Sequence, residues 1–183
     1  MVTTFYPPYS FGGDAMCVYR LATALGDSGH TVDVYHSEDA YRLQHPSDPE
    51  TEFVEHPNVT RRPLKTDRPM ASALRAYQSG KPSVYRDQLE PLLSGNNYDV
   101  IHYHNVSLMG GPGILKSGNA AKLYTAHEYW LLCPTHVLFA FNREACTERK
   151  CVRCTINAKR PPQYWRYTSL LKECTPHIDR FAA

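Results

Sequence analysis

The sequence predicts an α/β fold: a Rossmann-like parallel sheet with helices on both faces and a cysteine-bearing loop inserted into it. Three observations predict this class. A strand pattern, a glycine loop, a helix pattern and a second strand pattern follow one another within about 35 residues, which is the order of a βαβ unit. Further strand patterns recur in the second half of the chain, each followed by polar residues. A length of 183 residues is enough for one such domain with a buried core.

The first βαβ unit lies at the N-terminus. Residues 2–6 are β-branched and aromatic and are expected to form a strand, and the prolines and glycines of residues 7–14 predict a loop after it. Residues 31–36 are expected to form the second strand. The helix between them is predicted by apolar side chains at the spacing i, i+3, i+4 and i+7, namely Val18, Leu21, Ala22 and Leu25.

The later elements are predicted from the same patterns. Residues 37–97 match them only loosely, because this stretch contains many prolines and charges. In chain order, we expect a short strand at 58–64, helices at 69–78 and 83–93, a strand at 98–104, a glycine-rich turn at 110–113 with a short helix, a strand at 121–126, a helix at 163–174 and the start of a strand at 177–181. Because the chain ends inside this last strand, we expect residues 1–183 to be one domain that is truncated before a second.

The composition limits the class of protein. Hydrophobic residues make up 42% and charged residues 21%, which is typical of a globular protein and excludes a disordered or fibrous chain. The net charge of +2 gives no argument for a nucleic-acid partner. The chain has no transmembrane segment, since no apolar run approaches the roughly 20 residues that span a bilayer, and no signal peptide is found. We therefore expect a cytoplasmic protein with reduced cysteines, whose contact with a membrane would be peripheral, at its inner face.

Polar groups that could bind a ligand follow four of the predicted strands. In an open parallel sheet, ligands bind outside the carboxyl ends of the strands. The residues at this rim are Gly12 and Gly13, His36 and Ser37, His104 and Asn105, and His127 and Glu128. One polar residue after a strand would mean little, because such residues are common there. Three histidines together with a Gly–Gly loop favour a ligand site over a purely structural role.

The Gly12–Gly13 pair suits a diphosphate. Glycine has no Cβ, so its backbone N–H can approach an anion closely, and the N-terminus of the helix that follows adds a partial positive charge. The pair does not form the G-x-G-x-x-G fingerprint of dinucleotide-binding folds, and many Gly–Gly pairs are simply turns. Asp14 is expected either to cap the helix or to bind a sugar hydroxyl.

The aromatic and imidazole side chains of the rim have two interpretations each. His127 could donate a hydrogen bond to a sugar hydroxyl or bond to a neighbouring loop, and His104 carries the same two alternatives. His102 lies inside the strand pattern and is expected to be a buried residue with a satisfied hydrogen bond. Tyr129 and Trp130 could stack on an acceptor ring or be part of the core.

Four cysteines cluster in the loop at residues 133–159. Cys133, Cys146, Cys151 and Cys154 have the spacing C-x12-C-x4-C-x2-C, which suits an all-thiolate structural zinc site. Two disulfides, four free thiols and an iron–sulfur cluster are the alternatives. Four thiolates leave no open position on a metal, so we interpret the site as structural rather than catalytic. Cys17 and Cys174, the remaining two, are expected to be core residues.

Several of these stretches, taken in order, resemble the N-terminal domain of family-four glycosyltransferases, which have the GT-B fold. The matching stretches are residues 5–8 with Gly12-Gly13, 21–25 with 29–34, 98–105 and 125–130. A subset of that family is also similar through Leu132-Cys133-Pro134 followed by three spaced cysteines. The resemblance covers nearly the whole chain, although residues 37–97 match loosely, and Glu128 stands where the family often has aspartate.

The resemblance implies a retaining transfer of a sugar from a nucleoside diphosphate donor to a glycan, lipid or small-molecule acceptor, with no catalytic divalent metal. Gly12 and Gly13 would approach the donor diphosphate, His127 would be the catalytic residue touching the transferred sugar, and the remaining substrate contacts would come from Asp14, His104, Asn105, Glu128 and Tyr129. Most donor contacts in the family, including an E-x7-E motif, lie in a C-terminal donor-binding domain. No such motif occurs here, so the chain is expected to fold but not to turn over alone.

Two other functions compete with this one. The first is a non-enzymatic Rossmann-like module that binds a nucleotide or glycan or pairs with a separate catalytic subunit. The second is a zinc-stabilised interaction domain that uses the four-cysteine loop as its contact surface.

Overall fold

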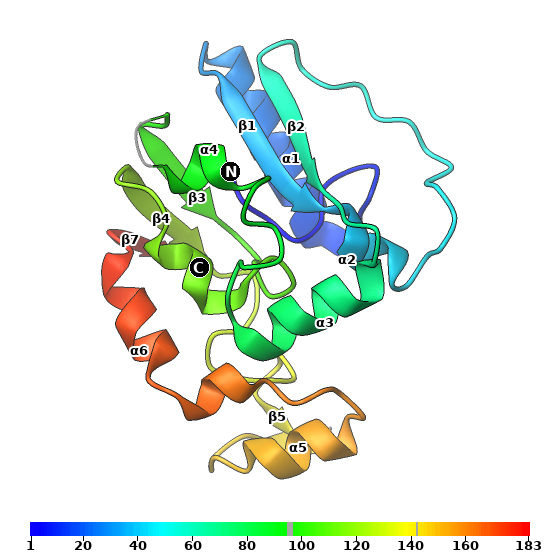
Figure 1. Cartoon of the computed structure of the whole chain (residues 1–183), viewed down its shortest axis with the longest axis vertical. Coiled ribbons are helices and arrows are strands. Elements are labelled where there is room, and N and C mark those ends of the chain that lie inside the picture. The colour runs from blue at the N-terminus through cyan, green and yellow to red at the C-terminus, as the bar shows by residue number, and fades with distance from the viewer. Residues whose placement is uncertain (95–96, 142) are drawn as a thin grey trace.

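The sheet of the molecule is parallel throughout its main part. The computed structural model describes residues 1–94, 97–141 and 143–183 (Figure 1). β1 (Val32–Ser37) pairs with β2 (Val59–Leu64), and β4 (Ala121–Thr125) pairs with both β3 (Val100–Tyr103) and β7 (Arg180–Ala182). These five strands lie where the sequence predicts strands, and the α/β class with parallel pairing is confirmed.

The N-terminal segment joins the two halves of this sheet. The expected strand at residues 2–6 is reduced to Val2, which forms parallel bridges with Tyr35 on one side and Tyr103 on the other. The backbone N–H of Val2 donates to the carbonyl of His102, and the N–H of Thr3 donates to that of Tyr35, both at 2.9 Å. Backbone hydrogen bonds to the neighbouring segments continue through Thr4, whose carbonyl accepts from the N–H of Ser37, and the prolines that follow Tyr6 have no N–H with which to extend the ladder further.

The spatial order is therefore β2, β1, the N-terminal segment, β3, β4 and β7. In chain order this is 3-2-1-4-5-6, the arrangement of doubly wound dinucleotide-binding sheets. The order reverses between the N-terminal segment and β3. At such a reversal, the connections leave toward opposite faces of the sheet and open a crevice beyond the strand ends.

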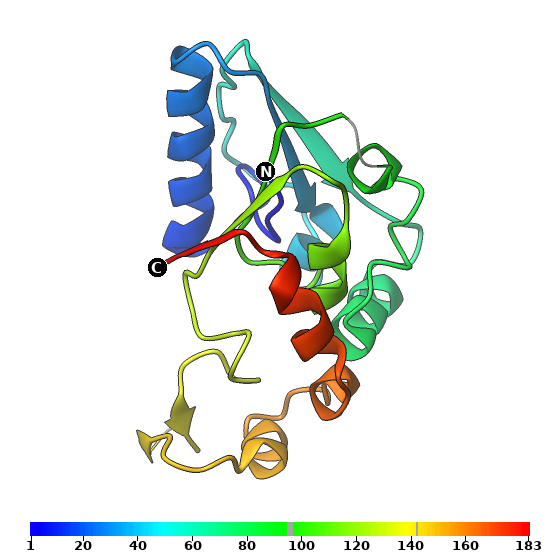
Figure 2. The ribbon, with the colours of Figure 1, turned by 90° about the vertical axis from the view of Figure 1, so that its left-hand side faces the viewer.

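Helices cover both faces of the sheet (Figure 2). α1 (Gly12–Asp27) lies alone on one face, and α3 (Pro69–Ser79), α4 (Glu90–Leu93) and α6 (Leu170–Cys174) lie on the other. A smaller core cluster forms under α1 from Tyr6, Val18, Ala22, Val32, Val34 and Val59. The larger cluster includes Tyr85, Leu89, Ile101, Met109, Ile114, Trp130 and Trp165. In the part of the chain that the structure describes, no helix is both long enough and apolar enough to cross a membrane.

A close contact between glycines connects α3 to η1, the 3-10 helix Gly111–Lys116. α3 ends at Gly80, which has a left-handed φ of +66°. The carbonyl of Gly80 accepts a 2.8 Å hydrogen bond from the N–H of Gly113. A Cβ on Gly111 would lie 2.6 Å from the Cα of Gly80. A side chain at Gly111 would therefore prevent this close contact between the end of α3 and η1.

Two predicted helices are wrong in extent. Within the expected helix at 83–93 only α4 is helical, because the buried Tyr85 is turned inward and donates a hydrogen bond to Asp39 at 3.1 Å. The expected helix at 163–174 is divided into η2 (Tyr164–Tyr167) and α6 by the extended backbone of Thr168. The short α2 (Glu38–Arg42) was not predicted at all.

The cysteine-rich loop forms a lobe at one end of the molecule (Figures 1 and 2). Its elements are the two-residue strands β5 (Phe139–Ala140) and β6 (Glu144–Ala145), followed by α5 (Cys151–Asn157). The sequence predicted a cysteine-bearing loop at 133–159, but it predicted neither the β5–β6 hairpin nor α5 within it. Asn142, within the lobe, lies outside the described residues, as do Gly95 and Asn96 before β3.

Candidate functional site

The residues that the sequence places after its strands lie at the rim of the sheet where the strand order reverses. The loop after the N-terminal segment leads to Gly12 and Gly13, and β3, on the other side of the reversal, leads to His104 and Asn105. β4 adds His127 and Glu128. Hydrogen bonds connect the side chains that follow β3 to those that follow β4, so these four residues form one continuous group.

Gly12 and Gly13 form the first turn of α1. The helix begins at Gly12, so the N–H groups of its first turn have no partner within the helix. A Cβ on Gly13 would meet no atom within 4 Å, so the space beside it is open. Asp14 is the third residue of the helix and not its N-cap, which is Phe11, and the carboxylate of Asp14 accepts the N–H of Ala15 at 2.8 Å. The capping alternative for Asp14 is therefore wrong, and diphosphate binding by the two glycines stays a prediction.

His104 and His127 form a hydrogen-bonded pair. The Nδ1 of His104 lies 2.9 Å from the Nε2 of His127, and their rings are stacked with centroids 5.2 Å apart. His104 is buried, and burial, together with the imidazoles of His102 and His127, lowers the pKa of His104 to about 2. The pair therefore contains a neutral His104 at any physiological pH.

The surroundings of His104 determine which of its nitrogens carries the proton. Its Nε2 is buried and has no hydrogen-bond partner among the residues that the structure describes, and a buried N–H without an acceptor is costly. We therefore assign the proton to Nδ1, from which it is donated to the Nε2 of His127. A neutral His127 then carries its own proton on Nδ1, so the group that it can offer to a ligand is a hydrogen-bond donor.

A second group of hydrogen bonds holds Asn105 and Glu128. The side-chain amide of Asn105 donates to Glu128 Oε1 at 2.8 Å, and the same oxygen lies 2.7 Å from the Nδ1 of His136. The side-chain carbonyl of Asn105 accepts from the backbone N–H and the hydroxyl of Ser107. Glu128 is thus directed at protein groups. His136 was missed, because a lone histidine in a loop gives no sequence signal.

Three further residues at or near the rim, His36, Ser37 and His102, contact neighbouring protein groups. His102 accepts or donates a 2.8 Å hydrogen bond with the hydroxyl of Thr125, as expected for a satisfied strand residue. His36 is buried against the rings of Tyr6 and Tyr9, and burial, then Arg61, lowers its pKa to about 3. Ser37 caps α2 by accepting the N–H of Ala40 at 3.1 Å.

Tyr129 and Trp130 point to different environments. Trp130 is buried in the main core against Trp165, so the stacking alternative is excluded for it. Tyr129 is 54% exposed and could contact a ligand. Arg166 contacts the segment from Trp130 to Cys133, because its guanidinium donates hydrogen bonds to the carbonyls of Trp130, Leu131 and Cys133. The guanidinium carbon also lies 4.2 Å from the centroid of the Trp165 ring. Sequence reasoning missed Arg166.

The four cysteines of the lobe have free thiols, and three of them line a common pocket. Cys133, Cys146 and Cys151 line one pocket of 420 Å³ together with Arg166, and Cys154 is buried on the inner side of α5. Cys133 accepts hydrogen bonds from Thr135 and from backbone N–H groups, which outweigh the effect of its burial and lower its pKa. Across residues 1–94, 97–141 and 143–183, no three His, Cys, Asp or Glu side chains are arranged to hold a metal ion. The zinc site stays a prediction. Outside the lobe, Cys174 is buried as expected, whereas Cys17 is exposed, because it lies on the solvent side of α1.

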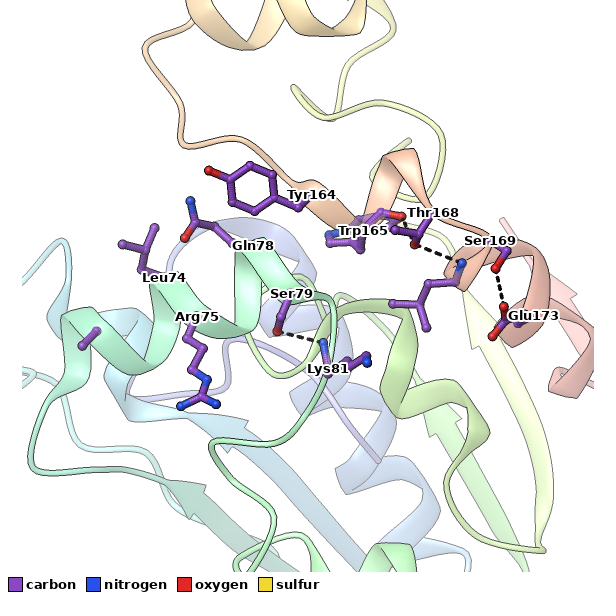
Figure 3. A pocket seen from close by; sticks show the side chains of 12 residues that line it. Leu74, Arg75, Gln78, Ser79, Lys81, Tyr164, Trp165, Thr168, Ser169 and Glu173 are labelled. Atoms are coloured by element: carbon purple, nitrogen blue, oxygen red, sulfur yellow. Dashed lines mark hydrogen bonds between the residues drawn. The ribbon is translucent and has the colours of Figure 1, made fainter.

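A larger pocket of 690 Å³ lies away from the rim (Figure 3). It opens between α3, from which Leu74, Arg75 and Gln78 line it, and the segment of η2 and α6, from which Tyr164 and Trp165 line it. None of the candidate rim residues lines this pocket. The size of a cavity therefore does not identify the site in this chain, whereas the topology of the sheet does.

Comparison with known proteins gives one match. The model of a protein family described as Glycosyltransferase Family 4 matches residues 11–183. The matched range begins one residue before α1 and includes every candidate rim residue and all four cysteines of the lobe. No curated protein and no solved structure matches the chain.

Proposed function

The chain belongs to glycosyltransferase family 4, and from this premise we propose that it is the acceptor-side half of a retaining enzyme whose donor is a nucleoside diphosphate sugar. One observation carries the proposal. The open first turn of α1 and the His104–His127 pair lie at the same reversal of the sheet order, where doubly wound sheets bind nucleotides. In this proposal the first turn of α1 supplies an anion site, and His127 supplies a hydrogen-bond donor at the same carboxyl-end rim of the sheet.

Each group has a distinct role in this proposal. The unpaired N–H groups at Gly12 and Gly13 and the positive end of α1 bind the donor diphosphate. His127, with its proton on Nδ1, donates a hydrogen bond to the transferred sugar. Tyr129, which is exposed, provides a face for the acceptor ring. The reaction itself needs a C-terminal half with the remaining donor contacts, so the chain alone binds weakly and does not turn over.

The experiment is a titration of the isotopically labelled chain with uridine, guanosine and adenosine diphosphates, followed by NMR. We expect the backbone amides of Gly12 and Gly13 and the ring of His127 to shift with one of the three. Gly13→Val fills the open space beside the helix and should weaken that binding at least tenfold, whereas Ala24→Val, at an exposed position of the same helix, should leave it unchanged. Equal binding by the two variants, or shifts elsewhere only, would exclude the proposed diphosphate site.

A structural zinc ion in the lobe is a separate proposal. Four thiolates are a suitable zinc ligand set, and three of the four cysteines already share a pocket. Zinc binding requires Cys154 to converge with them. Metal analysis of protein purified without chelator should find one zinc per chain. Cys154→Ser should lose the zinc, whereas Cys17→Ser, which changes an exposed cysteine outside the lobe, should retain it. A parent protein free of zinc after reconstitution would refute the proposal.

A further inference from the structure

Positive charge is concentrated in one segment of the lobe. Of the 20 basic and 18 acidic residues of the chain, six basic and two acidic ones fall within residues 143–160. This segment therefore has a formal charge of +4, whereas the rest of the chain has −2. The six basic residues are all exposed: Arg143, Arg149, Lys150, Arg153, Lys159 and Arg160. The charge is too local to be visible in the overall composition.

The helix inside this segment presents apolar side chains to solvent. Cys154 and Thr155 are the buried residues of α5. Val152 and Ile156, four residues apart and hence on one side of the helix, are 53% and 71% exposed. The lobe that carries them lies at one end of the molecule (Figure 1), and more than half of each of these aliphatic side chains faces solvent.

From this combination we propose that α5 and the basic residues on either side of it bind the surface of an anionic lipid membrane. Basic side chains near a membrane are attracted by acidic headgroups, and aliphatic side chains between them enter the boundary of the headgroups and acyl chains. A nucleic acid would use the charge but would leave Val152 and Ile156 in water. A second copy of this chain would meet the same positive charge on itself.

The proposal concerns binding only and does not depend on sugar transfer. The test is flotation of the chain with vesicles of phosphatidylcholine, either alone or with one quarter phosphatidylglycerol. We expect binding to the mixed vesicles, at least tenfold weaker binding to the neutral ones, and a loss of binding at high salt. Equal binding to both kinds of vesicle, or to neither, overturns the proposal.

Matched variants separate the two contributions. The pair Arg149→Glu and Arg153→Glu should reduce binding to the mixed vesicles at least tenfold, and the pair Val152→Ser and Ile156→Ser should reduce it severalfold at unchanged charge. The controls Arg20→Glu and Met70→Ser change exposed residues on α1 and α3 and should bind like the parent. Circular dichroism verifies that each variant is folded.

Two further results would assign the surface to another partner. A fluorescent single-stranded DNA that binds more tightly than the mixed vesicles, with Ile156→Ser leaving its affinity unchanged, would overturn the proposal in favour of nucleic acid. Dimers in sedimentation velocity that disappear with Ile156→Ser would overturn it in favour of self-association. The membrane proposal is supported if the parent chain is a monomer that binds the mixed vesicles and if each pair of variants weakens this binding.

Discussion

The Nδ1 of His104 lies 2.9 Å from the Nε2 of His127, which makes a buried, neutral imidazole the partner of the candidate catalytic residue. We predict that His104 fixes the tautomer of His127. In the parent chain, the ¹⁵N shifts of His127 should show a protonated Nδ1 and an unprotonated Nε2. His104→Leu removes the donor, and the two tautomers of His127 should then become mixed. His104→Asn can place an amide N–H where Nδ1 stood and should restore most of the parent pattern.

A protonated Nε2 on His127 in the parent chain would contradict the assignment. A parent-like pattern in His104→Leu would show that His104 has only a packing role. His102→Leu is the matched control, because His102 bonds to Thr125 and has no hydrogen bond to His127.

The buried histidines should make the fold sensitive to mild acid. Burial is the largest cause that lowers the pKa values of His36, His102 and His104 to about 3, 4 and 2. Below pH 6.5 the unfolded chain binds protons at these residues that the folded chain does not. The stability that these histidines contribute is thus fully present above that pH and decreases as the pH falls, by up to roughly 1.4 kcal/mol per pH unit for each histidine.

Urea unfolding at pH 7, 6 and 5 measures this slope. His36→Gln removes one of the titrating groups and should reduce the slope by up to roughly 1.4 kcal/mol per pH unit. A free energy of unfolding that is constant between pH 7 and pH 5 would contradict the prediction.

The contact between α3 and η1 should not tolerate a side chain at Gly80. Alanine there would adopt a left-handed φ of +66° and place its Cβ 2.7 Å from the Cγ of Trp165. We expect Gly80→Ala to lower the free energy of unfolding by about 3 kcal/mol or more, measured by urea denaturation. Gly13→Ala is the control. Its Cβ meets open space, so the change should be neutral or slightly stabilising. Similar stability losses in both variants would show that the close contact is not the cause.

Arg166 should order the chain that follows Tyr129. Its guanidinium reaches three carbonyls between Trp130 and Cys133, a geometry that the single ammonium group of lysine cannot reproduce. In Arg166→Lys, we expect the amides of Cys133 and His136 to exchange with deuterium at least tenfold faster, with those of β1 unchanged. Lys172→Arg, on α6 and exposed, is the control. Unchanged deuterium exchange at Cys133 would mean that residues 130–133 are stable without the hydrogen bonds from Arg166.

The sequence predicted the strands of this fold better than its helices. The strand patterns at β1, β3 and β4 contain closely spaced apolar or β-branched residues, and the expected strands match the structure there; β2 was also placed correctly, although its pattern is weaker. The segment at 83–93 carries helical spacing, but Tyr85 turns inward to reach Asp39, a contact across 46 residues that no local pattern contains. Tertiary contacts, not propensity, decided that segment.

The candidate site was predictable in part for the same reason. Residues that follow strands could be listed from the sequence, because the sheet rule places them at one rim. The side-chain partners within the site depend instead on how the loops fold over that rim. These are the pairing of His104 with His127, the contacts of Glu128 with Asn105 and His136, and the hydrogen bonds from Arg166 to backbone carbonyls. Such side-chain partners lie up to 36 residues apart and leave no spacing to recognise.

The bridges at Val2 also have a consequence for the order of assembly. The partners of this residue are Tyr35 and Tyr103, so Val2 needs a partner that is synthesised about 100 residues later. β1 and β2 can pair early, but the sheet closes only after β3 has been synthesised. Until then, one edge of the N-terminal segment is unpaired and exposed. A nascent chain stalled before residue 100 should therefore be a substrate for chaperones, although the completed sheet is not.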